Sequence, residues 1–187
     1  MFIQTEATPN PATLKFLPGQ DVLGSGTADF PSAKTAEKSP LAQRIFAVDG
    51  VSGVFLGADF VTVTKDDALD WDIVKAPILG AIMEHFQSGH PVIESEGASA
   101  SGHAEHDGED GEIVDQIKEL LDTRVRPAVA QDGGDIVFHG FDRGIVYLHM
   151  QGACAGCPSS TLTLKMGIEN LLRHYIPEVL EVRPVAA

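Results

Sequence analysis

The sequence is short of cysteine: only two of its 187 residues are cysteines, at positions 154 and 157. Small secreted scaffolds are held together by several disulfides, so this chain does not belong to that class. Structural zinc sites and iron–sulfur clusters use four ligands as a rule. Two thiols therefore leave any such site half complete within a single chain.

Basic residues are also scarce. The chain has 13 Lys and Arg against 27 Asp and Glu, which gives a formal net charge of −14 at pH 7. Nucleic-acid-binding proteins display basic patches, and anionic membranes attract basic surfaces, so we expect neither partner. No segment has the roughly 18 consecutive apolar residues that a membrane-spanning helix needs.

The N-terminus shows no targeting pattern. It reads Met-Phe-Ile-Gln-Thr-Glu, without the basic start and apolar core of a signal peptide and without the Arg-rich composition of a transit peptide. We therefore expect a reducing compartment. The bacterial cytoplasm is the first expectation, and the mitochondrial matrix is the alternative for a mature form.

An acidic segment of small residues divides the chain. Residues 94–111 contain six acids and no base, a composition that cannot bury apolar surface. We predict two small α+β domains, residues 1–93 and 112–187, joined by a flexible acidic linker over this segment. His103 and His106 lie in the linker, where nothing would hold them for metal binding.

The first domain mixes strands and helices. Thr13–Leu17 alternates as a strand, whereas residues 24–36 are rich in Gly, Ser, Ala and Pro and predict a loop. Ser39, followed by proline, is typical of a helix N-cap with Pro at the first helical position. Val51–Leu56 and Asp59–Thr64 predict a β-hairpin. No residue pattern in this domain indicates a chemistry.

The second domain has the predicted order αββαβ. Apolar residues recur at helical spacing over 113–121, and Pro127 kinks or restarts this helix. Two alternating segments form strands about an Asp-Arg-Gly turn. Pro158 then begins a second helix, whose buried side includes Ile168 and Tyr175. The expected strands are 136–141, 145–150 and 179–182.

Both cysteines lie in one loop between the second of these strands and the second helix. Two intervening residues let both sulfurs face one point. Gly152 and Gly156 permit positive φ angles, so that backbone N–H groups turn toward the sulfurs. Pro158 places Cys157 at a helix N-terminus, whose partial positive charge favours the thiolate. Small alanine side chains leave room for a bulky group near the surface.

Four interpretations of the loop are open: two cysteines without a role, a thiol oxidoreductase, half of a zinc site and half of an iron–sulfur site. The βαβ start and bulky flanking residues of thioredoxin-like proteins are missing. Spacing does not separate zinc from iron–sulfur. For either metal, two loops meeting on a two-fold axis would supply four thiolates, so we predict a metal-dependent homodimer. The other nearby candidates, His139 and His149, are expected on strand faces.

Several segments resemble a known family. The second domain resembles the NifU-type C-terminal domain of the Nfu iron–sulfur proteins through Leu121–Arg124, Arg126 with Pro127, Asp132–Asp135 and above all Gln151–Thr161. The first domain resembles the Nfu N-terminal domain through Gln4–Pro11 and Val48–Val51. The resemblance covers nearly the whole chain outside the linker.

The resemblance implies a scaffold or carrier, not an enzyme. In this family one [4Fe–4S] cluster bridges two protomers and passes to apo-proteins. Cys154 and Cys157 match the family's ligand positions and would bind the cluster. The implied partners are a second copy, an upstream cluster donor and apo iron–sulfur clients. The longer NifU proteins have further domains that this chain lacks, so we expect carriage of clusters assembled elsewhere.

Overall fold

The computed structural model describes residues 1–94, 110–155 and 158–185. The chain divides into two compact units, Met1–Ser101 and Gly102–Ala187. Residues 95–109 of the predicted linker lie outside the described residues, so the linker and its limits remain a prediction. Among the described helices, none is long and apolar enough to cross a membrane.

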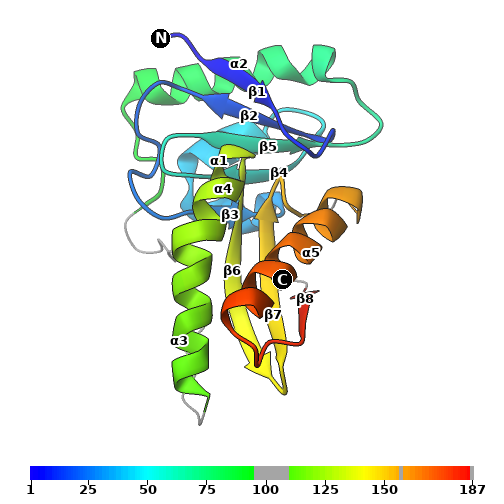
Figure 1. The fold of residues 1–187 in the computed structure, drawn as a ribbon. Coiled ribbons are helices and arrows are strands. Elements are labelled where there is room, and N and C mark those ends of the chain that lie inside the picture. The colour runs from blue at the N-terminus through cyan, green and yellow to red at the C-terminus, as the bar shows by residue number, and fades with distance from the viewer. Residues whose placement is uncertain (95–109, 156–157, 186–187) are drawn as a thin grey trace. The chain divides into compact units, whose positions relative to one another are not determined.

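The N-terminal unit is built on an antiparallel sheet of five strands in the order β1-β2-β5-β4-β3 (Figure 1). The strands are β1 (Gln4–Ala7), β2 (Thr13–Leu17), β3 (Ala28–Phe30), β4 (Val51–Leu56) and β5 (Val61–Lys65). The strand at 13–17 and the β4–β5 hairpin are confirmed, although β5 begins two residues later than predicted.

Two α-helices pack with this sheet around one apolar core. They are α1 (Pro40–Phe46) and α2 (Trp71–Ser88). The predicted cap is confirmed, because the Ala42 N–H donates to Ser39 Oγ at 3.1 Å and proline follows at the first helical position. Both helices direct buried residues into the core, including Leu41 and Ile78.

The prediction of a loop over residues 24–36 is wrong. This segment contains β3 and the start of a 3-10 helix, η1 (Ala33–Lys38). The Phe30 side chain is buried, and its backbone pairs with Val54 of β4. Burial of one aromatic side chain and pairing with a neighbouring strand outweigh a Gly- and Ser-rich local composition.

The C-terminal unit has the order αββαβ, so the predicted fold class is confirmed (Figure 1). Its first helix runs without interruption through three segments, and three strands follow in the sheet order β6-β7-β8. The elements are α3 (Gly111–Leu120), η2 (Leu121–Val125), α4 (Arg126–Gln131), β6 (Gly134–Asp142), β7 (Ile145–Gly152), α5 (Pro158–Tyr175) and β8 (Glu181–Val185).

The β6–β7 hairpin closes through a two-residue turn. Arg143 and Gly144 both have positive φ angles, 49° and 82°, which is typical of a type I′ turn that matches the twist of the strands. β8 pairs with β7 in the parallel sense. It begins at Glu181 and not at residue 179, because the Val179 N–H donates to the Ile176 carbonyl in a turn.

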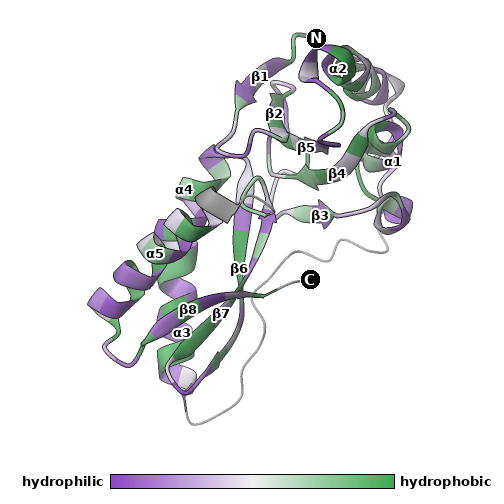
Figure 2. Ribbon diagram, turned by 90° about the vertical axis from the view of Figure 1, so that its right-hand side faces the viewer, coloured by the Kyte–Doolittle hydropathy of each residue, from purple (hydrophilic) through white to green (hydrophobic). Residues whose placement is uncertain are grey.

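The helices bury one side against the sheet. The core includes Ile117, Leu121, Ile168 and Leu172, as the helical spacing predicts. Tyr175 is half exposed and Ile176 takes the buried position, so the assignment of Tyr175 to the core is wrong. Figure 2 shows hydrophobic and hydrophilic stretches together on α3 and α5, as expected for helices with one buried side.

Candidate functional site

The cysteine loop connects β7 to α5 and rests on the turn before β6. Gly152 ends β7 with a φ of 60°, which confirms the predicted positive φ at this position. The Ala153 N–H donates to the Gly133 carbonyl at 3.2 Å. From α5, the Thr161 hydroxyl donates to the Cys154 carbonyl at 3.2 Å. The loop is therefore held from the turn at one end and from the helix at the other.

Of the two predicted ligands, the structure describes Cys154. Its side chain is only 7% exposed and belongs to the core of the C-terminal unit. Burial, followed by the negative charges of Asp132 and Asp135, raises the pKa of this thiol to about 12. The thiolate predicted from the helix N-terminus was that of Cys157, so the burial of Cys154 does not test it. Cys157 lies outside the described residues.

Gly134, the first residue of β6, lies directly against Cys154. A Cβ atom at this position would be 2.5 Å from Cys154 Sγ, 2.8 Å from the Gln151 carbonyl oxygen and 2.9 Å from the Cys154 nitrogen. Side chains do not approach other atoms so closely, so glycine is required here by contact. Gly134, the second glycine of the Asp-Gly-Gly-Asp segment, therefore allows the Cys154 side chain to pack directly against the backbone of β6.

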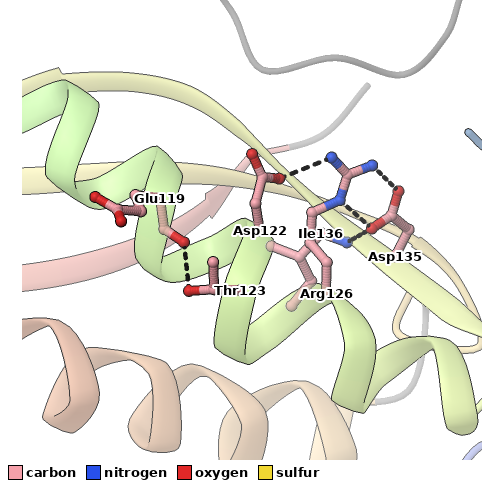
Figure 3. Close-up of polar contacts among 6 residues, drawn as sticks. All are labelled: Glu119, Asp122, Thr123, Arg126, Asp135 and Ile136. Carbon is pink, nitrogen blue, oxygen red and sulfur yellow. Dashed lines mark hydrogen bonds and ion pairs between the residues drawn. The ribbon is translucent and has the colours of Figure 1, made fainter.

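An ion-pair network fixes the turn on the other side of Gly134 (Figure 3). Arg126 donates from Nε and Nη2 to the two carboxylate oxygens of Asp135, both at 2.8 Å, and from Nη1 to Asp122 at 3.0 Å. Asp135 also accepts the Ile136 N–H at 2.8 Å, and its side chain is 4% exposed. The hydrogen bond to Asp135 is the main cause that raises the pKa of Arg126.

No sequence pattern predicted this network, although its residues lie in the segments that carry the family resemblance. A signal was present: Asp135 adjoins a predicted apolar strand, and a buried carboxylate requires a partner. Asp122 and Arg126 are four residues apart, the spacing of a helical ion pair. The sequence did not show that Asp135, which follows a glycine turn, would accept hydrogen bonds from Arg126 as well.

A π-helical turn, η2, directly precedes Arg126. Pro127 is the next residue. In an α-helix a proline ring clashes with the carbonyl four residues earlier, which here is that of Thr123. The wider turn accommodates the proline without ending the helix. Within it, the Thr123 hydroxyl donates to the Glu119 carbonyl at 2.7 Å (Figure 3). Pro127 was predicted to kink or restart the helix; it lies at the start of α4, directly after this π-helical turn, and helical backbone continues through it.

The two strand histidines that were candidate ligands, His139 and His149, have other surroundings. His139 is exposed on β6, at a bulge where the register with β7 shifts. His149 lies on β7 with Nδ1 3.3 Å from the Val185 carbonyl. The described residues contain no group of three or more His, Cys, Asp or Glu that could hold a metal ion. His103 and His106 lie outside the described residues.

Two family profiles match the chain: "Scaffold protein Nfu/NifU N terminal" over residues 3–89 and "NifU-like domain" over residues 117–183. A human protein named "NFU1 iron-sulfur cluster scaffold homolog, mitochondrial" is 52% identical over 99% of this chain and 72% of its own length. The chain belongs to the Nfu/NifU family of scaffold proteins. The resemblance found in the sequence is confirmed.

Other members of the Nfu/NifU family are as similar. "NifU-like protein 5, mitochondrial" of Arabidopsis thaliana is 56% identical over 96% of this chain and 66% of its own length. The chain thus spans about two thirds of the length of such relatives. A solution structure of a NifU-like protein from Saccharomyces cerevisiae aligns with 51% of this chain and 87% of its own, at 32% identity and a TM-score of 0.46.

Proposed function

We propose that this chain is an iron–sulfur cluster scaffold and carrier that holds one [4Fe–4S] cluster between two copies and transfers it to apo-proteins. The observation that carries the proposal is that its only two cysteines lie in one loop of a NifU-like domain. Relatives that carry "iron-sulfur cluster scaffold" in their names support it. The cluster is cargo, and the protein completes no chemical turnover of its own.

The number of ligands is the reason for a second copy. A [4Fe–4S] cluster is held by four cysteine thiolates. Cys154 and Cys157 supply two, and the described residues contain no group of three or more His, Cys, Asp or Glu that could complete a metal site. Two copies related by a two-fold axis supply four thiolates from equivalent positions.

Sharing the ligands suits a cargo that must be released. Each copy holds half of the bonds, so a cysteine of the acceptor replaces one scaffold thiolate at a time and no iron is left without a ligand. Metal binding displaces the thiol proton. Before loading, the buried and protonated Cys154 is protected from oxidation, because the thiolate is the reactive form.

The cellular compartment is proposed from the relatives. The Arabidopsis and human relatives are named as mitochondrial, which favours the mitochondrial matrix over the bacterial cytoplasm expected first. Both compartments keep thiols reduced, so the chemistry of the loop does not depend on the choice.

A transfer assay tests this function. The full chain is loaded anaerobically with iron and sulfide and mixed with an apo-enzyme that needs a [4Fe–4S] cluster, with a chelator present to capture free iron. We expect activation of the acceptor by the wild-type chain and none by Cys154→Ser or Cys157→Ser. If the variants activate the acceptor as well as the wild type does, the proposal is wrong.

A further inference from the structure

The first turns of α5 carry two large apolar side chains that are more than half exposed in the part of the chain that the structure describes. Leu162 and Met166 are each 57% exposed. They are four residues apart, so they lie on one face of the helix. Thr163 and Gly167 are exposed beside them, and a Cβ atom at Gly167 would have no neighbour within 4 Å.

This face has almost no charge. Between residues 158 and 168 the sequence contains no acid, and its one base, Lys165, is 3.8 Å from Glu181. Elsewhere the chain is strongly acidic, with a net charge of −14. Two copies of such a chain repel each other over most of their surface. The start of α5 is a place where they can approach with little repulsion.

The face also lies next to the cluster loop. Cys157 directly precedes Pro158, the first residue of α5. With a rise of about 1.5 Å per residue, Leu162 is about 6 Å and Met166 about 12 Å along the helix from Pro158, its first residue. When two copies bind one cluster, the beginnings of their α5 helices are therefore brought close together.

We propose that the α5 face, defined as Leu162, Thr163, Met166 and Gly167, is the contact between two copies in the cluster-bound dimer. This inference rests on the proposed function, because the shared cluster brings the copies together. The partner is a second copy, since the chain supplies half of the ligands and the uncharged face adjoins them.

The small size of the face predicts how the dimer behaves. Stable interfaces bury about 1,600 Å² in total, far more than two exposed side chains per copy provide. The face alone therefore does not hold two copies together. It adds to the four metal–thiolate bonds, so the dimer forms with its cargo and separates when the cargo leaves.

A charge-swap experiment tests the contact. In a two-fold contact the face meets itself, so identical charges on both copies repel and opposite charges attract. One full-length variant carries Leu162→Asp with Met166→Asp, and the other carries Leu162→Lys with Met166→Lys. Leu180→Asp is the control, because Leu180 is 64% exposed on the same unit but lies beyond the far end of α5.

Each protein is loaded anaerobically with iron and sulfide, and two quantities are measured: the mass of the loaded species and the rate of iron loss to a chelator. We expect each double variant to lose iron about tenfold faster than the wild type, equivalent to about 1.4 kcal/mol. Mixing the two variants before loading should restore the wild-type rate. Leu180→Asp should leave it unchanged.

Two results would overturn the contact while leaving the proposed function intact. One is a double variant that loads a dimer with the wild-type rate of iron loss, even if its transfer to an acceptor is slower, since the face would then belong to the client. The other is a loss that mixing does not restore. If the wild-type chain binds no cluster bridging two copies, the proposed function itself fails.

Discussion

Replacing Arg126 by Gln leaves the Asp135 carboxylate buried without its positive partner. The Asp135 side chain is 4% exposed and loses two charge-assisted hydrogen bonds of 2.8 Å, while the Ile136 N–H still donates to it. Removing one member of a buried ion pair costs about 3–5 kcal/mol. We expect about 3 kcal/mol for Arg126→Gln, because the Ile136 N–H still donates. Arg126→Lys keeps the positive charge but loses the bidentate pairing with the carboxylate, and should lower the free energy of unfolding by about 1–2 kcal/mol.

The assay uses the distribution of aromatic residues. Trp71, the only tryptophan, lies in the N-terminal unit, and both tyrosines, Tyr147 and Tyr175, lie in the C-terminal unit. In a urea titration of the full chain, Arg126→Gln should shift the tyrosine-reported transition and leave the tryptophan-reported one in place.

A matched control separates this ion pair from a surface one. Arg173 is 54% exposed and lies 3.7 Å from Glu169, so Arg173→Gln should cost at most about 0.5 kcal/mol. Combining Arg126→Gln with Asp135→Asn removes the unpaired charge and should recover about 2 kcal/mol. An Arg126→Gln variant as stable as Arg173→Gln would refute the reasoning.

Three further predictions concern single side chains. Gly134→Ala should destabilise the C-terminal unit by about 1–3 kcal/mol in the same titration, whereas Gly140→Ala on the same strand, where the nearest atom is 4.0 Å from the added Cβ, should not. Burial, followed by the charges of nearby basic groups, lowers the pKa of His85 from 6.5, so the unfolded chain binds the proton more readily than the folded one. The N-terminal unit should therefore lose stability as the pH falls below about 6.5. His85→Leu should abolish this pH dependence. In a Cys157→Ser variant, alkylation of Cys154 at neutral pH should be about 1,000-fold slower than in urea, because the pKa of about 12 leaves little thiolate; equal rates would contradict its burial.

Local patterns were sufficient to predict much of the fold. Ser39 with its following proline marked the start of α1, and apolar spacing identified Ile117 and Ile168 as core residues. The Asp-Arg-Gly turn located the β6–β7 hairpin. These features depend on residues close together in sequence, so a single sequence contains them.

Features that depend on distant contacts were missed. β3 exists because Phe30 is buried and pairs with β4, and the burial of Cys154 follows from its packing against Gly134, twenty residues earlier. The bond from Arg126 to Asp135 likewise crosses a turn that the sequence does not place in space. The cysteine loop could therefore be predicted from the sequence, whereas the residues that support it could not.

The central claim is that two copies share one cluster through Cys154 and Cys157. The most direct test is the intact mass of the anaerobically loaded full chain by native mass spectrometry, together with iron and acid-labile sulfide analysis. We predict a dimer with about four irons and four sulfides, and no cluster-bound dimer from Cys154→Ser or Cys157→Ser. A complete cluster on a single chain, or on either variant, would contradict the claim.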